Sequence, residues 1–458
     1  LRKFAGLDVP LEDAVEAMAV ALFLSDDPLG DQVDVLSLTY PILDVERFQI
    51  AAAAATRLRT MNVDLASLAE EGSPPPLAAY LVLDRDLPAE GTAITLSNTP
   101  RMLCQALFFG RQTDREPWLE LHPLAAGDEQ AVEAVLKESL PATMGPPAKR
   151  EVTERMSRSQ DLLARNFSLP RSTLPEQVVE LIRQHYDDGL LNRWPAMPLG
   201  LLDGKSPQEA AAEPRYHVPL LAAILLLEFW TQQNGSQFDF NRLRQRLGLP
   251  TQEPIDPDQV DLANLPVTRL ARVEIEKVPD EGLLRGFRRA MSAAALPAMR
   301  KFGGALLDRP SFTDQENREQ ILSLLTRVED DSDRALKYVA EGRALAEKAG
   351  RSSAPWDLME LSIRFARGEE AETSRIFQHL SRQHVREPGV AVALQDWLMQ
   401  IGAIRPDGTP AAAAVPSSQG QPSLVVPTET GADPGKLWTP GGQQALEEKP
   451  KLWMPGMD

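Results

Sequence analysis

The spacing of apolar residues divides the chain into regions with different expected secondary structure. In the first part, short apolar runs are bounded by turn-forming residues, a pattern typical of β-strands. The expected strands are 33–43, 78–83, 92–96 and 118–121. Helical spacing over 11–24 and an Ala-rich stretch at 45–61 indicate two helices beside them. We therefore predict an α+β domain with an antiparallel sheet over 1–145.

Helical spacing predominates after a Pro-rich linker at 141–147. The expected helices of this second region are 151–166, 175–186, 220–230, 238–247 and 283–302, the last interrupted at Pro297. The segment 220–230 is almost wholly apolar, which predicts a buried helix. We assign 146–309 to a helical domain.

A more regular pattern follows over 310–403. Thr313 and Glu316 form a predicted capping box at the start of its first helix. Further helices are expected at 333–349, 355–367, 369–384 and 390–401, three of the turns being marked by Gly350, Gly368 and Gly402. Paired helices with short turns predict an α-solenoid or a small bundle. The expected fold class is therefore mainly α, with an α+β domain at the N-terminus.

Residues 311–403 loosely resemble tetratricopeptide-type repeats. If Trp356 takes the place of the family's first-helix Trp, Glu360 stands where the family has a small residue and Glu372 where it has Ala. The resemblance implies stacked helical hairpins that bind peptides or partner proteins. The alternative is a plain helical bundle that only completes the fold.

The last region, 404–458, is rich in Pro, Gly, Ala and Ser and is predicted to be a disordered, flexible tail. It contains the sequence Lys-Leu-Trp-x-Pro-Gly twice, beginning at Lys436 and at Lys451. Trp is mostly apolar surface, so two copies in such a tail indicate a docking motif. The expected partner-binding residues are Leu437, Trp438, Pro440, Leu452, Trp453 and Pro455. The motif binds either another protein or a groove on this chain's own helical region.

The chain is acidic, with a formal net charge of -18 and a pI near 4.9. This charge argues against a dedicated nucleic-acid binder, which presents a basic surface. Two basic clusters nevertheless form a candidate surface for RNA, acidic protein or anionic lipid: Arg150, Arg155 and Arg158, and Arg285, Arg288 and Arg289. The simpler interpretation is that both lie on helix faces beside acidic neighbours.

Cys104 is the only cysteine, so an intrachain disulfide and a Cys-based zinc site are excluded. It lies in the apolar run 101–109 and is expected to be a buried, inert thiol. A lone cysteine fits a reducing, cytoplasmic location. The longest apolar run, 218–230, is too short to cross a bilayer and contains Glu228. The chain begins at Leu1 with no initiator Met, which leaves open a leader or a further domain before it.

The segment 200–206, Gly-Leu-Leu-Asp-Gly-Lys-Ser, is similar to a phosphate-binding loop but has three residues between its glycines instead of four. Pro207 also removes a backbone N–H that would bind phosphate. A helix start explains these residues better. Ser206 and Glu209 form a capping box, with Pro207 at the first helical position.

The longer segment from Trp194 through the Leu-x-Gly-Lys-Ser-Pro turn to Ala211 resembles a small helical module. This module occurs in Xre/MbcA/ParS-type antitoxins and beside SEC-C-like segments, and the resemblance covers about 176–230. It implies a protein-contact module. DNA binding and zinc binding are not implied, because the chain lacks a preceding helix-turn-helix pattern and a Cys/His cluster. The alternative is a packing turn with Trp194 and Leu202 in the core.

Candidate catalytic residues are few. The carboxylates that border the expected strands are Asp84, Asp86, Asp114 and Glu116, with His122 nearby in the sequence. His379 and His384 are five residues apart, which places them on different faces of an α-helix, whereas a helical zinc pair has a spacing of four. We expect each to be an isolated surface residue and predict no catalytic, cofactor or metal site.

Three functions stay open. The leading one is an interaction or regulatory scaffold without catalytic activity, which binds a protein or peptide partner. The second is a hydrolase-type enzyme with its site in the first domain or in residues before Leu1. The third is an RNA- or ribosome-associated factor that uses the basic clusters.

Overall fold

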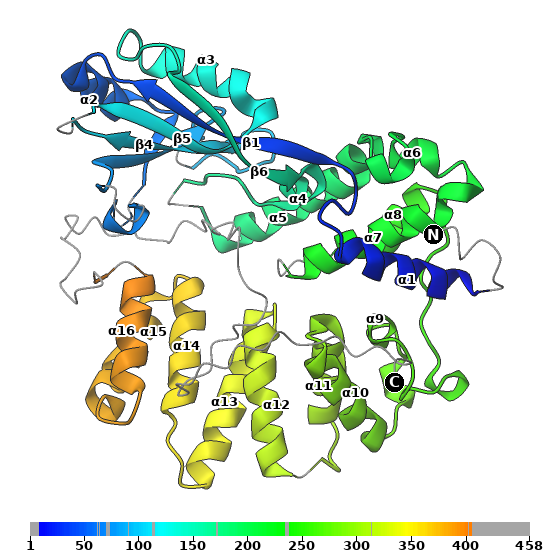
Figure 1. The fold of residues 1–458 in the computed structure, drawn as a ribbon. Helices are drawn as coiled ribbons and strands as arrows, with labels where there is room; N and C mark the ends of the chain where they lie inside the picture. The colour runs from blue at the N-terminus through cyan, green and yellow to red at the C-terminus, as the bar shows by residue number, and fades with distance from the viewer. Residues whose placement is uncertain are drawn as a thin grey trace, which may run out of the picture.

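The computed structural model describes residues 9–404 except 62, 64, 70–73, 90, 112–114, 171–172, 234–237, 313 and 402. Both copies of the tail motif, with Trp438 and Trp453, therefore lie outside the described residues. The described chain is mainly α-helical with an α+β region at its N-terminal end, as predicted (Figure 1).

The N-terminal region contains a six-stranded antiparallel sheet in the order β2-β3-β4-β5-β1-β6. Its strands are β1 (Gln32–Pro41), β2 (Leu58–Thr60), β3 (Ala78–Leu83), β4 (Met102–Phe109), β5 (Trp118–Ala125) and β6 (Lys149–Ser157). Alternate residues such as Leu36, Leu38 and Tyr40 point into one core, because strand side chains alternate between faces. Helices α2 (Val45–Ala54) and α3 (Glu129–Ser139) cover that face (Figure 1).

Strand β6 corrects the predicted helix at 151–166, which is wrong. Residues 149–157 pair with β1 from Thr39 opposite Lys149 to Gln32 opposite Ser157, and only the short α4 (Arg158–Leu163) is helical. β6 lies at the edge of the sheet, and edge strands are often highly charged, which conceals the alternation that marks a strand. The sheet thus continues past the predicted boundary at residue 145.

Two smaller differences concern the other strands. The predicted strand at 92–96 is wrong, since these residues lie in turns and irregular backbone. The run 101–109, interpreted only as the surroundings of Cys104, contains β4. The predicted strands at 33–43, 78–83 and 118–121 are confirmed as β1, β3 and β5.

A second core joins the N-terminal helix to the middle of the chain. α1 (Leu11–Phe23) packs along α7 (His217–Gln233), beside α5 (Pro175–Asp188), α6 (Pro207–Ala210) and α8 (Phe240–Arg246). α7 is apolar nearly all round, and seven of its eight buried residues lie within 220–230, the segment predicted to be a buried helix. We call this unit, α1 with α4 to α8, the middle block.

From residue 280 the helices stack side by side in chain order, each contacting the next as far as α15, while α16 packs against α14 (Figure 1). They are α10 (Asp280–Ser292), α11 (Leu296–Leu307), α12 (Gln315–Val328), α13 (Ser332–Lys348), α14 (Ala354–Ala366), α15 (Glu370–His379) and α16 (Val390–Gln400). We call this unit the helical array. It begins one hairpin earlier than the predicted boundary at 310, and the expected helix 283–302 is in fact α10 and part of α11, with Pro297 in the first turn of α11.

Glycines let the helices of the array approach closely. A Cβ at Gly286 would meet the ring of Phe302 at 2.2 Å, and a Cβ at Gly342 would meet the ring of Trp356 at 2.3 Å. No side chain fits at such distances, so these glycines leave the space that aromatic rings from the next helix occupy. α12 is capped by Asp314, which accepts from the Asn317 N–H at 3.2 Å, one residue later than the cap predicted at Thr313.

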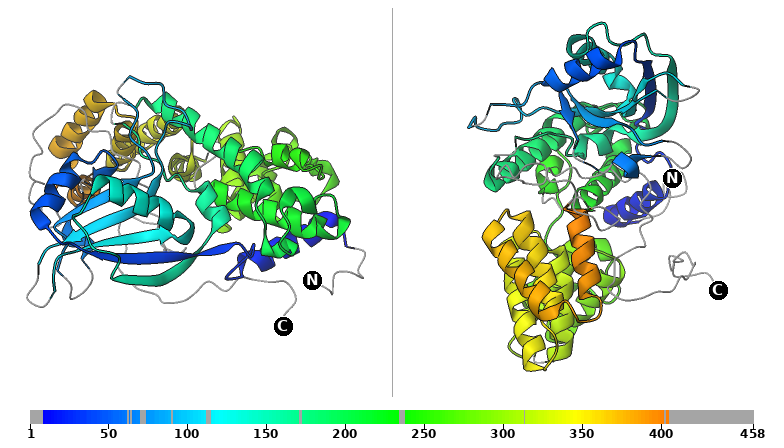
Figure 2. Two further views of the ribbon diagram at one scale, coloured as in Figure 1. Left: turned by 90° about the horizontal axis from the view of Figure 1, so that it is seen from above. Right: turned by 90° about the vertical axis from the view of Figure 1, so that its left-hand side faces the viewer.

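The helical array lies below the sheet and α1 in the right-hand view of Figure 2. Charged groups connect α1 of the middle block to the segment that leads into the array. Arg269, in the short helix α9 (Val267–Leu270), donates to both Glu16 carboxylate oxygens at 2.8 and 2.9 Å and also contacts Asp13. Arg272 contacts Glu12. The acidic side chains of the first two turns of α1 therefore hold the segment that leads into the array in place.

Candidate functional site

A cleft of about 750 Å³ lies where the middle block meets the array. Phe238 and Phe240 line one side at the start of α8, with ring centroids 5.0 Å apart. The array contributes charged side chains, among them Arg300, Lys301 and Asp308. Aromatic surface beside fixed charges of both signs is suited to binding a polar chain with an apolar anchor.

Two cations of this cleft, Lys301 and Arg300, are held by hydrogen bonds to neighbouring backbone and side chains. Lys301 Nζ donates to the Ala271 carbonyl at 2.9 Å, and burial lowers the pKa of its ammonium group. Arg300 donates to the Val328 carbonyl at 2.5 Å and to Asp330 at 2.9 Å. The wall is therefore largely preorganised, which reduces the entropy lost when a ligand binds.

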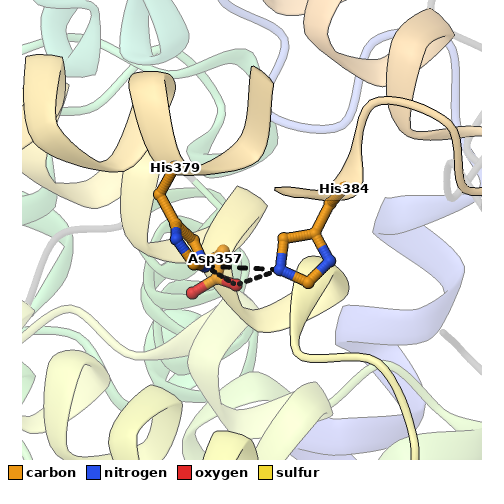
Figure 3. Close-up of side chains that lie close together, drawn as sticks. All are labelled: Asp357, His379 and His384. Carbon is orange, nitrogen blue, oxygen red and sulfur yellow. Dashed lines mark hydrogen bonds and ion pairs between the residues drawn. The ribbon is translucent and has the colours of Figure 1, made fainter. Parts of the chain in front are cut away.

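A second constellation lies at the far end of the array, where Asp357, His379 and His384 converge (Figure 3). His379 Nε2 is 3.3 Å from His384 Nε2, and Asp357 Oδ2 is 3.8 and 3.9 Å from these two nitrogens. Asp357 lies in the first turn of α14, His379 ends α15, and His384 ends the next turn. We call these three residues the Asp–His–His cluster.

The prediction that His379 and His384 lie on different faces is wrong. Residues 380–384 form a π-helical turn, which has i→i+5 hydrogen bonds and therefore brings residues five apart onto one side. Such π-turns are rare in proteins and are often found at functional sites. The sequence contained one usable signal, the His spacing of five, but it becomes meaningful only once the π-turn is known.

Each member of the cluster has further partners. The Ser353 hydroxyl donates to Asp357 Oδ2 at 2.7 Å, and Arg343 lies 2.8 Å from Asp357 Oδ1. His384 Nδ1 is 2.6 Å from Glu387 Oε1, and the hydroxyl of Ser352 also bonds to Glu387.

These contacts orient the ring of His384 and determine its tautomer. The hydrogen bonds from Ser352 and from His384 lower the pKa of Glu387, so its carboxylate is ionised and only accepts. Nδ1 of His384 therefore carries the proton, and in the neutral ring the Nε2 lone pair points to the centre of the cluster. Within the described residues, this is the one group of three or more His, Cys, Asp and Glu side chains with ligand atoms this close together.

The basic clusters lie in different parts of the fold. Arg150 and Arg155 on β6 pair with Glu129 and Asp34, and Arg158 donates to the carbonyls of Asp31 and Pro198. On α10, Arg285 pairs with Glu281, Arg289 donates to the carbonyls of Leu262 and Leu265, and Arg288 is exposed. Figure 1 places β6 in the sheet and α10 in the array.

The carboxylates of the first domain do not gather around His122. Asp84 pairs with Arg85 at 2.8 Å and Glu116 with Arg111 at 2.6 Å, while Asp114 is outside the described residues. Asp86 accepts from the Thr56 hydroxyl at 2.5 Å. His122 contacts the Thr153 hydroxyl at 3.3 Å. Each of these groups, Asp114 aside, thus has a partner of its own.

The segment around Trp194 is structural in its details. Trp194 and Leu202 are fully buried, and Trp194 Nε1 donates to the Ser159 hydroxyl at 3.1 Å. The capping box of Ser206 and Glu209 with Pro207 at the first position is present as predicted. Lys205 forms an ion pair with Glu213. The packing turn thus accounts for each of these residues.

Among the residues described, no helix combines the length and the apolar character needed to cross a membrane. No protein-family model, no curated protein and no solved structure matches the chain.

Proposed function

We propose that the chain is a non-catalytic interaction scaffold of the reducing cytoplasm, whose helical array binds an extended segment of a partner protein. The observation that carries this proposal is the cleft of about 750 Å³ between Phe238 and Phe240 on one side and the first hairpins of the array on the other. The stacked hairpins support it, since stacks of the tetratricopeptide type bind peptides in this way.

The chemistry of the cleft defines the expected segment. The half-buried ring of Phe238, which packs on the buried Phe240, offers an aromatic surface for one large apolar side chain. Asp239 and Asp308 offer carboxylates for a Lys or Arg nearby. The tail motif Lys-Leu-Trp-x-Pro-Gly has both features in one frame. A partner segment of the same type, or the tail itself, therefore suits this surface.

Charge reversal at the mouth of the cleft tests the proposal. Asp308 is an exposed residue of the cleft wall, so Asp308→Arg leaves the core unchanged while repelling a basic segment. Binding of a Lys-Leu-Trp-Thr-Pro-Gly peptide to the full chain, followed by fluorescence anisotropy, is expected to weaken at least about tenfold. Asp258→Arg, at an exposed position of a short 3₁₀ helix outside the cleft lining, is the matched control. Equal affinity of all three proteins would contradict the cleft as the binding site.

The tail is tested separately in the full chain. Trp438→Ala combined with Trp453→Ala is expected to abolish capture of a partner that the unmodified chain retains, because the Trp rings are the anchors. Val425→Ala is the control, since it removes apolar surface from the tail outside both motifs. Equal capture by the double variant would exclude the tail motif as a docking element.

A further inference from the structure

We propose that the Asp–His–His cluster is a zinc site, with Asp357 Oδ2, His379 Nε2 and His384 Nε2 as its ligands. Two imidazoles and one carboxylate are a ligand set typical of Zn²⁺ sites that keep a fourth position for water. This inference is independent of the cleft and goes beyond the proposed scaffold function.

The distances among the three atoms fit the ion. A circle through atoms separated by 3.3, 3.8 and 3.9 Å has a radius of about 2.1 Å, so one point lies at that distance from all three. Zn–N and Zn–O bonds are about 2.0–2.2 Å long. The ligands therefore need only small adjustments to hold the ion.

The surroundings of the cluster are those of a prepared site. Ligating His residues usually donate their other ring nitrogen to a carboxylate, and His384 Nδ1 does so to Glu387. Asp357 is likewise fixed, by Ser353 on the ligating oxygen and by Arg343 on the other one.

The site is open on one side. The side chain of His379 is 45% exposed, whereas those of His384 and Asp357 are 14% and 6% exposed. An ion can therefore enter past His379, and a water molecule can occupy the fourth position. Once bound, the ion would join the first turn of α14 to the end of α15. The apolar core at this end of the array is small, so the ion would add a substantial part of its stability.

Zinc titration of the full, tag-free chain after chelator treatment tests the site. Isothermal titration calorimetry is expected to show one Zn²⁺ per chain, and Co²⁺ to give the visible absorption of a four-coordinate site. His379→Ala removes the most exposed ligand, so the variant should fold and bind Zn²⁺ at least about 100-fold more weakly. Glu387→Gln is expected to weaken binding about tenfold through His384.

His122→Ala is the matched control, because it removes a partly exposed His from the sheet. It should leave zinc affinity unchanged, and zinc should raise the melting temperature of this control but not of His379→Ala. Asp357→Asn, checked by circular dichroism, provides a second ligand variant. Absence of stoichiometric binding, or equal affinity in His379→Ala and the unmodified chain, would overturn the proposal.

Discussion

The middle block and the far end of the helical array are both helical, but they are stabilised by different interactions. The middle block surrounds α7 and Trp194 with apolar side chains, most of them fully buried. The pair α14–α15 has a small apolar core, and two buried carboxylates, Asp357 and Glu360, lie among arginines. The stability of the middle block therefore depends mainly on the apolar area that it buries. The stability of α14–α15 depends on charged groups, whose interactions respond to solution conditions.

The charge network of the array runs from helix to helix. Glu360 contacts Arg343 of α13 and, at 3.2 Å, Arg364 of its own helix. Arg367, at the C-terminal end of α14, forms an ion pair with Asp333 at the start of α13. A buried carboxylate contributes stability only while its arginine partners stay in place. The end of the array is therefore the part of the molecule in which pH, a metal ion or a partner can change stability most.

Trp194→Ala tests the apolar side of this comparison and should have the largest effect. Trp194 is fully buried, so its removal leaves a cavity and takes away the hydrogen bond that the Ser159 hydroxyl accepts, while that hydroxyl still donates to Asp31. We expect a loss of about 3–5 kcal/mol in the free energy of unfolding, measured by urea denaturation. Trp194→Phe is the control and should cost less. A loss below about 1 kcal/mol for Trp194→Ala would contradict a core centred on this residue.

Gly342→Ala tests whether close packing also matters within the array. The added Cβ would meet the Trp356 ring at 2.3 Å, so α13 and α14 must separate. We expect a loss of about 1–3 kcal/mol, seen as earlier unfolding in urea. Gly127→Ala is the control, because nothing lies within 4 Å of its added Cβ. Equal stability of the two variants would show that α13 and α14 are not closely packed at Gly342.

The array could be predicted largely from sequence because its contacts are local. The residues that start or end these helices, such as Pro355, Gly350 and Gly368, are recognisable from the local sequence. Accordingly, α13, α14 and α16 match the expected ranges within one or two residues. The sheet could not be predicted to the same extent. β6 pairs with β1, a strand more than a hundred residues earlier. The exposed charged residues of β6 give no local sequence pattern from which this pairing could be predicted.

The candidate sites were predicted less well than the fold. The cleft combines α8 with α11, and no local pattern brings Phe238 to Asp308. The Asp–His–His cluster depends on one π-turn, a deviation that propensity does not reveal. In contrast, the cap at Ser206 was predicted correctly because both of its partners lie within three residues.

Acidification should change the stability of the two regions in opposite directions, destabilising α14 but not the middle block, and this effect should be smaller than those above. Burial opposes ionisation of Glu360, but Arg343 and Arg364 outweigh it and lower its pKa below the ordinary value of 4.5. A carboxylate with a lowered pKa stabilises the fold above the unfolded pKa, and this stability is lost as pH falls through the folded pKa. In the middle block, burial raises the pKa of Asp161, so its protonation favours the folded state instead.

Hydrogen exchange measures this separation, comparing 354–366 with 217–233 at about pH 5 and about pH 3, after correction for intrinsic rates. We expect protection to fall in α14 and to hold in α7. Glu360→Gln keeps the size of the side chain but not its charge, so the variant should start with weaker protection in α14 and lose less of it on acidification. If α14 in the variant keeps the full pH response of the unmodified chain, Glu360 is not its source, and the stability of the array depends on packing as that of the middle block does.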